Sequence, residues 1–175
     1  MLLTLHTERL VLRPPKAADG AALSAAINDV RVLSQTGTWG FPSGQDVCAA
    51  RLAQAARYDP REDMVLLVTA DGIVLGTVGL HRRGAGVFEL GYMLGPGAWG
   101  RGYATEAARA ACAYGFGPLG AARLTATVFA DNPASMRVLE KLGFDGPHPA
   151  PDGWSPVREA SLPTVAYVLD KESRP

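Results

Sequence analysis

The stretch ELGYMLGPGAWGRGYATEAARAACAYGF, residues 89–116, decides the fold of this chain. Its beginning continues an apolar, β-rich run that predicts a strand over residues 87–94, and four glycines follow between Gly95 and Gly102. Beyond them, small side chains recur at helical spacing and predict a helix over residues 103–116. The members of this stripe are Ala104, Ala107, Ala108, Ala111, Cys112 and Gly115, and they predict close packing of the helix on a sheet.

The glycine-rich loop is a candidate anion site. The first N–H groups of a helix have no partner within the helix, and glycines let a phosphate approach the backbone closely. Arg101 adds a positive charge beside them. The alternative is a turn that is rich in glycine only for tight geometry, but four glycines are more than such a turn needs. The loop therefore predicts a site for a phosphate-bearing ligand.

The same glycines fit the dinucleotide-binding pattern G-x-G-x-x-G at Gly95, Gly97 and Gly100. That pattern normally opens a parallel unit and is followed, about 20 residues on, by an acidic residue at the end of the next strand. Here the preceding strand belongs to an antiparallel meander, and the first acidic residue after Glu106 is Asp131. We therefore reject a Rossmann dinucleotide site.

Strands and helices alternate outward from this stretch without an internal repeat. Asp71-Gly72 predicts a hairpin turn, and the helix over residues 103–116 predicts that the strands on either side of it are parallel. The predicted strands cover residues 10–13, 64–69, 73–81, 87–94, 123–129 and 164–169.

Helix signals occur at three further places. Asp19 is a plausible cap for a helix that reaches Val30, and Ser43 with Asp46 resembles a capping box for a helix that ends near Tyr58. Asn132 followed by Pro133 predicts the start of a short helix, which the Gly143 region ends. The five prolines between residues 145 and 163 predict a loop there.

Composition predicts one compact domain over residues 1–175, since 47% of the residues are hydrophobic. Seventeen basic residues balance seventeen acidic ones, which argues against a nucleic-acid or membrane partner. The N-terminus has no basic segment before its apolar opening, so we expect a cytoplasmic protein. Cys48 and Cys112 lack the spacing of a metal site, and no metal is expected.

Two separated motifs resemble the GNAT superfamily of acetyl-CoA-dependent N-acetyltransferases: WGRGYATEA at residues 99–107 and NPASMRVLEKLGF at residues 132–144. The opening TERLVLR at residues 7–13 and the strand ELGYML at residues 89–94 are similar to the RimJ/RimL branch, whose members acetylate ribosomal proteins. The resemblance implies a mixed α/β (α+β) fold. Its central, mostly antiparallel twisted sheet would have about six or seven strands and about four flanking helices, with a splayed parallel strand pair.

The resemblance also implies acetyl-CoA as cosubstrate. Its pyrophosphate would lie on the backbone N–H groups of Gly100 to Ala104, and its pantetheine arm would pair with free backbone groups of Met93 and Leu94. Trp99 stands where many members have Gln or Arg. Arg137 is either a contact of the outer phosphates or a solvated cation. The full predicted set is Met93, Leu94, Trp99, Gly100, Arg101, Gly102, Tyr103, Ala104, Asn132 and Arg137.

Glu89 and Ser135 are the candidate catalytic residues. Glu89 lies mid-strand among apolar residues, where burial would raise its pKa and suit it as a general base, directly or through water. The alternative is a solvated carboxylate that attracts a cationic acceptor. The tyrosine acid of many family members falls at Leu139, which leaves Ser135 as the nearby hydroxyl or as an ordinary helix-start residue. His81, at a strand end, is the one histidine of further interest.

Trp39 and Phe41 follow the first predicted helix, in a loop that lines the acceptor side of the resembling family, or they anchor that loop on the core. We expect direct transfer in a ternary complex to a primary amine, either a protein N-terminus or a small molecule, because Cys112 belongs to the packed stripe and is no nucleophile. A silent acyl-CoA-binding module is the alternative function. Edge strands often mediate dimers, which keeps a homodimer among the alternatives.

Overall fold

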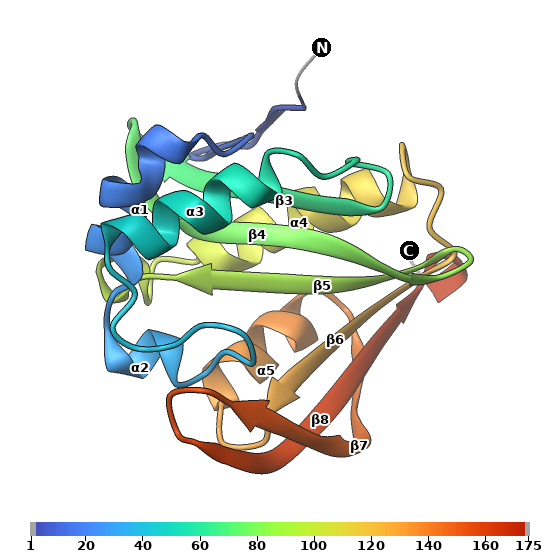
Figure 1. The fold of residues 1–175 in the computed structure, drawn as a ribbon. Coiled ribbons are helices and arrows are strands. Elements are labelled where there is room, and N and C mark those ends of the chain that lie inside the picture. Colours follow the sequence, from blue (N-terminus) through green and yellow to red (C-terminus); the bar gives the residue numbers. More distant parts are fainter. Residues whose placement is uncertain (1–2, 174–175) are drawn as a thin grey trace.

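A computed structural model describes residues 3–173 and shows an eight-stranded sheet with helices on both faces (Figure 1). The strand order is β1-β2-β3-β4-β5-β6-β8-β7, and every neighbouring pair is antiparallel except β5 and β6. The strands are β1 (Leu5–His6), β2 (Val11–Arg13), β3 (Asp63–Ala70), β4 (Ile73–Gly84), β5 (Val87–Leu94), β6 (Arg123–Phe129), β7 (Asp145–Ser155) and β8 (Ala160–Asp170).

The helices form two layers. On one face of the sheet lie α4 and α5, and on the other lie α1, α2 and α3. Their bounds are α1 (Gly20–Ile27), α2 (Val30–Leu33), α3 (Gln45–Ala55), α4 (Tyr103–Phe116) and α5 (Pro133–Lys141), with short 3-10 turns η1 (Ala17–Asp19), η2 (Pro96–Ala98) and η3 (Lys171–Ser173). No helix within residues 3–173 is long and apolar enough to cross a bilayer. The expected mixed α/β fold is confirmed.

The elements of residues 87–129 have the predicted bounds. Strands β5 and β6 and helix α4 begin and end where the sequence placed them, and β5 and β6 are parallel. The β3–β4 hairpin turns at Asp71 and Gly72, whose φ values of 49° and 79° fit a type I′ turn. Glycine spacing, helix periodicity and turn chemistry are local signals, and here the tertiary structure agrees with them.

The segment over residues 145–163 corrects the sequence analysis. It was expected to be a loop, but most of it forms β7 and the start of β8. Strand β7 lies at the edge of the sheet and pairs only with β8, so its prolines need to donate no hydrogen bond on the open side. The pairing of β7 with β8 is irregular at two places, where the register shifts after Asp145 and after Ala150. With β1, this edge strand brings the sheet to eight strands.

The first predicted helix, expected to reach Val30, ends at Ile27 as α1, and the separate short helix α2 begins at Val30. Asp29 caps the short α2 by accepting a hydrogen bond from the Arg31 N–H at 2.8 Å, and the Asn28 side chain accepts one from the Ser43 N–H at 2.8 Å. Ser43 therefore does not form the predicted capping box, and Gly44 is the N-cap residue of α3. The Ser43 hydroxyl instead donates to the Gly40 carbonyl at 2.7 Å. The Asn28–Ser43 contact, which spans 15 residues, fixes the loop between α2 and α3.

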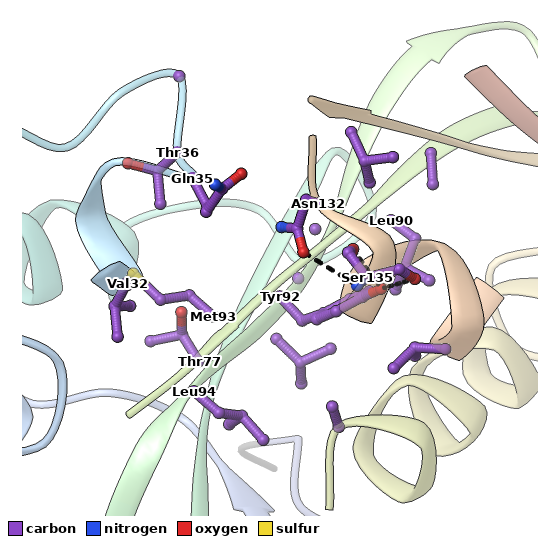
Figure 2. Close-up of a pocket in the computed structure, with 18 of the residues that line it drawn as sticks. Val32, Gln35, Thr36, Thr77, Leu90, Tyr92, Met93, Leu94, Asn132 and Ser135 are labelled. Carbon is purple, nitrogen blue, oxygen red and sulfur yellow. Dashed lines mark hydrogen bonds between the residues drawn. The ribbon is translucent and has the colours of Figure 1, made fainter. Parts of the chain in front are cut away.

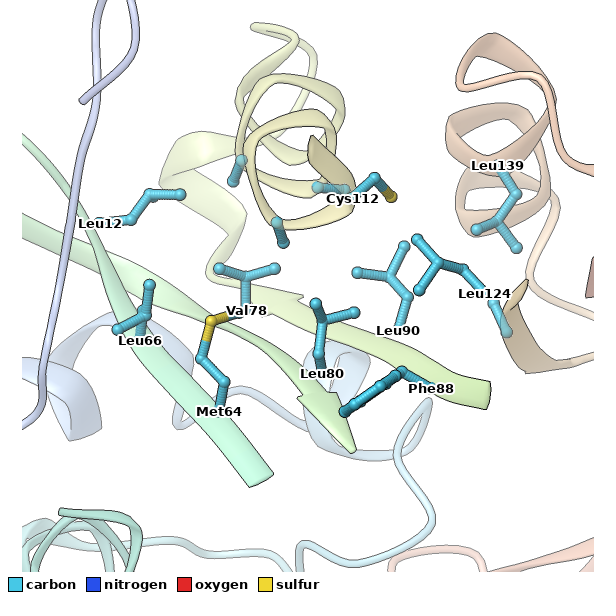
Figure 3. Close-up of a cluster of buried hydrophobic side chains, with 14 of the residues drawn as sticks. Leu12, Met64, Leu66, Val78, Leu80, Phe88, Leu90, Cys112, Leu124 and Leu139 are labelled. Carbon is cyan, nitrogen blue, oxygen red and sulfur yellow. The ribbon is translucent and has the colours of Figure 1, made fainter. Parts of the chain in front are cut away.

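The main core lies between the sheet and α4 (Figure 3). Buried side chains from β2 to β6 meet the predicted small-residue stripe of α4, in which Ala108 and Ala111 are fully buried. A Cβ added to Gly115 would lie 3.0 Å from Leu80 and 3.2 Å from Leu124. The helix backbone therefore sits directly on the sheet, which fixes the start of α4 relative to the end of β5.

Candidate active site

A cleft of about 1360 Å³ opens where β5 and β6 separate. Their pairing covers only Val87↔Arg123, Phe88↔Leu124 and Glu89↔Thr125, after which β6 continues on β8 alone. Figure 1 shows the two strands starting together and diverging, with α2 and its following loop beside the opening. The expected splayed strand pair is therefore present, and one edge of β5 has no neighbouring strand beyond Glu89.

The register of β5 decides which backbone groups face this cleft. The Gly95 N–H donates to the Leu75 carbonyl at 2.9 Å, and alternate residues of a strand direct their backbone groups to opposite sides. The backbone of Met93 therefore faces β4, whereas those of Tyr92 and Leu94 face the cleft. The expected use of the Met93 backbone is wrong for this reason. Part of Leu94 is also engaged, since its carbonyl accepts a hydrogen bond from Trp99 Nε1 at 2.8 Å.

The loop before α4 presents backbone donors at the mouth of the cleft. Gly100 and Gly102 have φ values of 71° and 78°, a conformation that glycine adopts without strain. Gly102 is the N-cap residue of α4, and no side chain caps the helix. Within residues 3–173, no protein group accepts a hydrogen bond from the N–H groups of Gly100 to Ala104. The loop thus has the geometry of an anion site.

Hydrogen bonds from the N-terminal segment hold this loop in place. The Arg9 guanidinium donates to Glu106 Oε2 at 2.8 Å and to the Arg101 carbonyl at 2.9 Å, and it stacks over the Tyr103 ring. Although burial acts to raise the pKa of Glu106, hydrogen bonds from Thr7 and Arg9 lower it overall. Sequence reasoning assigned no role to Arg9 or Glu106, because their contact joins segments about a hundred residues apart.

Two hydroxyl groups meet at the wall of the cleft formed by α5. The Tyr92 hydroxyl lies 2.8 Å from Ser135 Oγ and 3.1 Å from the Ser135 carbonyl, while Asn132 Oδ1 accepts the Ser135 N–H at 3.1 Å (Figure 2). Burial raises the pKa of Tyr92 to about 12, so this phenol stays protonated at neutral pH. The pair can therefore donate a proton into the cleft.

Tyr92 is the functional candidate that sequence reasoning missed. Leu139, at the expected tyrosine position, is fully buried in the core. Tyr92 alternates along β5 with Leu90 and Leu94, which share its face of the sheet. That period-two pattern was the available signal, but it does not show which residue of α5 the phenol reaches.

Glycines form the floor of the cleft on the face of the sheet opposite to Tyr92. Gly79 pairs with Gly91 across β4 and β5, between the rows Thr77↔Met93 and His81↔Glu89. All three rows line the cleft on the face that packs against α1 to α3. A Cβ added to Gly91 would meet nothing within 4 Å. The sheet is therefore locally open where an acceptor group would have to reach β5.

We expect Gly91→Leu to leave the fold intact and to raise the KM for an acceptor amine about tenfold, because the new side chain fills this space at a cost of about 1.4 kcal/mol. The measurement is the dependence of CoA release on acceptor concentration. Gly84→Leu is the matched control, since that glycine also has open space around it and does not line the cleft. An unaltered KM in the Gly91 variant would contradict the placement of the acceptor.

Glu89 is partnered and only partly buried, whereas the sequence analysis expected a buried carboxylate. Arg83 contacts its Oε2 through Nε at 2.7 Å and Nη2 at 2.7 Å, and the side chain is 26% exposed. The burial is only partial because the side chain borders the cleft, where Arg83, two residues beyond His81 on β4, pairs with it. Both contacts fall on Oε2, which leaves Oε1 available to a ligand.

Of the two aromatic residues predicted to bind the acceptor, Trp39 lines the cleft and Phe41 does not. Trp39 lines the cleft and lies under the Arg51 guanidinium, 4.3 Å from the ring centroid. Phe41 is 49% exposed and does not line the cleft, so its predicted role in acceptor binding is not supported. The cause is the loop path, since Phe41 lies within the turn that Ser43 and Gly40 close, whereas Trp39 precedes that turn.

An arginine from the β7–β8 turn joins the segments around the mouth. Arg158 donates to the Ser34 carbonyl at 2.8 Å and forms an ion pair with Asp131 at 2.5 Å. Its hydrogen bond lowers the pKa of the Asp131 carboxyl. Asp131 directly precedes Asn132, so this arginine ties the end of α2 to the start of α5. The loop that follows α2 and the hydroxyl pair are thereby held in one framework.

Cationic side chains lie along the outer part of the cleft. Arg137 and Lys141 line its α5 wall, and the Arg31 guanidinium lies 5.5 Å from the Trp99 ring centroid. Arg101 stacks on Tyr103 at 5.1 Å instead of lining the cleft. Among residues 3–173, no group of three His, Cys, Asp or Glu side chains is placed to hold a metal ion.

Comparison with known proteins identifies the family of this chain. Residues 9–145 match the family described as "Acetyltransferase (GNAT) domain". The chain belongs to the GNAT acetyltransferase family. It is 32% identical to the "Uncharacterized N-acetyltransferase YoaA" of Bacillus subtilis (strain 168), over 80% of this chain and 81% of that protein. The resemblance carried by residues 99–107 and 132–144 is therefore confirmed.

Solved structures extend the GNAT likeness to the whole fold. A crystal structure described as "Probable acetyltransferase" has a TM-score of 0.85 at 25% identity, covering 98% of this chain and 99% of that chain. RimJ from Mycobacterium smegmatis, solved in complex with CoA-disulfide, has a TM-score of 0.83 at 21% identity, covering 95% and 84%. The fold is thus shared with RimJ.

Proposed function

We propose that this GNAT acetyltransferase moves an acetyl group from acetyl-CoA to a primary amine, a protein N-terminus or a small molecule, by direct transfer in a ternary complex. One observation carries the proposal. The unpartnered N–H groups before α4, the open edge of β5 and the Tyr92–Ser135 hydroxyl pair all border the same cleft. A diphosphate, an amide-containing arm and a thioester are the chemical groups that fit these three features.

The loop fits the diphosphate part of CoA. Its backbone N–H groups from Gly100 to Ala104 lack protein acceptors among the described residues, and a Cβ added to Gly100 would meet nothing within 4 Å. The N–H of Leu94, on the open side of β5, would pair with the pantetheine arm. Asn132 would support the arm indirectly by fixing Ser135, and Arg137 would face the outer phosphates. Bound in this way, acetyl-CoA supplies an activated acetyl thioester.

Glu89 would serve the acceptor. An ionised carboxylate at the rim of the glycine floor attracts an ammonium group, and its Oε1 is left available by Arg83. Proton acceptance by the same carboxylate, directly or through water, was the other role predicted for it. We assign ammonium binding and not proton acceptance to Glu89, since Arg83 engages Oε2 and leaves Oε1 as the atom that can contact the ammonium group. The Tyr92–Ser135 pair would return a proton to the departing sulfur.

The test is CoA release by the wild-type protein over a panel of N-terminal peptides and small amines, with acetyl-CoA affinity measured in parallel. We expect amine-dependent release, and a roughly tenfold lower kcat/KM for Glu89→Gln at unchanged acetyl-CoA affinity, as for loss of one charge-assisted contact of about 1.4 kcal/mol. Glu62→Gln is the matched control, because Glu62 is paired with Arg82 outside the cleft. Acetyl-CoA binding without amine-dependent release would instead favour a silent acyl-CoA-binding module.

A further inference from the structure

A histidine–aspartate pair lies on the acceptor side of the cleft, next to Glu89. His81 Nδ1 and Asp63 Oδ1 are 2.7 Å apart on the neighbouring strands β4 and β3. The register places Asp63, His81 and Glu89 in one row across β3, β4 and β5, so their side chains share a face. His81 lines the cleft, whereas Asp63 lies behind it. Neither residue has a part in the chemistry described so far.

The imidazole is directed toward the glycine floor. His81 Nε2 lies 3.2 Å from the position that a Cβ on Gly79 would occupy, so the ring leans along β4 over that glycine. Gly79 is opposite Gly91, where the acceptor-side face is open. Nε2 is thus on the cleft side of the ring, while Nδ1 is held from behind by Asp63. A nitrogen atom entering over the two glycines would come close to Nε2.

This orientation fixes the proton on one ring nitrogen. A carboxylate only accepts hydrogen bonds, so Nδ1 of the neutral imidazole donates to Asp63 and Nε2 carries the free lone pair. A protonated primary amine cannot attack a thioester, and it must first lose a proton to a nearby acceptor. Glu89, bound to Arg83 and placed to hold the ammonium group, leaves that task to a second group.

We propose that His81 Nε2, oriented by Asp63, is the proton acceptor for the amine in the acetyl transfer; the assignment rests on the proposed function. Nε2 takes one proton from the ammonium group and passes it to solvent. The neutral nitrogen then bonds to the acetyl carbon, and the carbon–sulfur bond breaks with its electron pair on sulfur. The nitrogen releases a second proton to solvent, and the hydroxyl pair, which gives one proton to sulfur, regains one from solvent. The products are an amide, a thiol and one proton.

Several charged and titratable groups surround His81. Asp63 on β3 and Glu89 on β5 flank the imidazole. Arg83, which lies on β4 like His81, is engaged by Glu89. Arg51 on α3 and Tyr58, beyond the end of that helix, also line the cleft. An imidazolium cannot accept a proton, so the rate must fall on the acid side as the imidazole becomes protonated.

The decisive experiment compares His81→Gln and Asp63→Asn with wild type by measuring kcat/KM against pH, acetyl-CoA affinity, and the NMR titration of the imidazole in the free protein. We expect His81→Gln to lower kcat/KM at neutral pH about tenfold, since water in an open cleft replaces part of the function, and to remove the acid limb. Asp63→Asn should displace both the acid limb and the NMR titration of His81, because asparagine donates to Nδ1 and favours the other tautomer. Acetyl-CoA affinity should stay unchanged in both.

His148→Gln is the matched control. His148 forms a second histidine–aspartate contact, with Asp145 at 2.9 Å, on edge strand β7 outside the cleft, and its loss should leave the profile as in wild type. The inference is overturned if folded His81→Gln keeps the acid limb, or if only Glu89→Gln removes it. If His81→Gln does not fold, an unaltered profile in Asp63→Asn overturns it. These results differ from failure of the proposed function, in which wild type releases no CoA with any amine.

Discussion

Replacement of Gly102 by Asp is expected to weaken acetyl-CoA binding roughly 100-fold, a loss of about 3 kcal/mol. Gly102 is the N-cap residue of α4, with φ of 78° and with the unpartnered N–H groups of the loop around it. A carboxylate here would satisfy those donors and repel a diphosphate. Aspartate tolerates the left-handed region better than most residues, so the charge and not the backbone should dominate. Isothermal titration with acetyl-CoA measures the effect.

Two matched variants separate charge from strain. Gly102→Ala introduces the strain without the charge, and a Cβ at this position would lie 3.4 Å from Arg9 Nη2. Gly72→Asp introduces the same charge at φ of 79° in the β3–β4 turn, outside the cleft. We expect full acetyl-CoA affinity in Gly72→Asp and a much smaller loss in Gly102→Ala than in Gly102→Asp. Undiminished binding by folded Gly102→Asp would refute the anion site.

Replacement of Tyr92 by Phe is expected to lower kcat roughly 100-fold, the usual size of a general acid's contribution. The phenol lies 2.8 Å from Ser135 Oγ, and the two hydroxyls would act as one proton donor to the departing sulfur. Ser135→Ala should therefore have a similar effect, and the double variant should be little worse than either single one. Steady-state CoA release at saturating substrates, with acetyl-CoA affinity unchanged, provides the measurement.

The pH dependence of this step follows from burial. Burial raises the pKa of Tyr92 to about 12, above the ordinary value, so the group loses its proton only in strong alkali. Up to about pH 10, deprotonation of this phenol should therefore cause no decline in the wild-type rate.

Tyr114→Phe is the control for the Tyr92→Phe variant, since Tyr114 lies on α4 away from the cleft. A wild-type kcat in Tyr92→Phe would show that water protonates the sulfur and would remove this pair from the chemistry.

The candidate site was only partly predictable, because its parts differ in how local their signals are. Gly100 and Gly102 were found because a glycine-rich loop before a helix is a contiguous pattern. The cap of Asn132 on Ser135 was found for the same reason, since it spans three residues. By contrast, the Tyr92–Ser135 contact spans 43 residues, and nothing in either segment alone specifies its partner.

The sequence by itself determined β5, α4 and β6, and with them the parallel pair and the loop between Leu94 and Tyr103. Their periodicity and glycine placement are properties of neighbouring residues, so they hold wherever the segment packs. Only the tertiary structure decided that the backbone of Leu94 and not that of Met93 faces the cleft, because that choice depends on the register with β4. It also decided that proline-rich β7 is a strand. At the edge of the sheet no further strand needs a hydrogen bond from the N–H groups that its prolines lack.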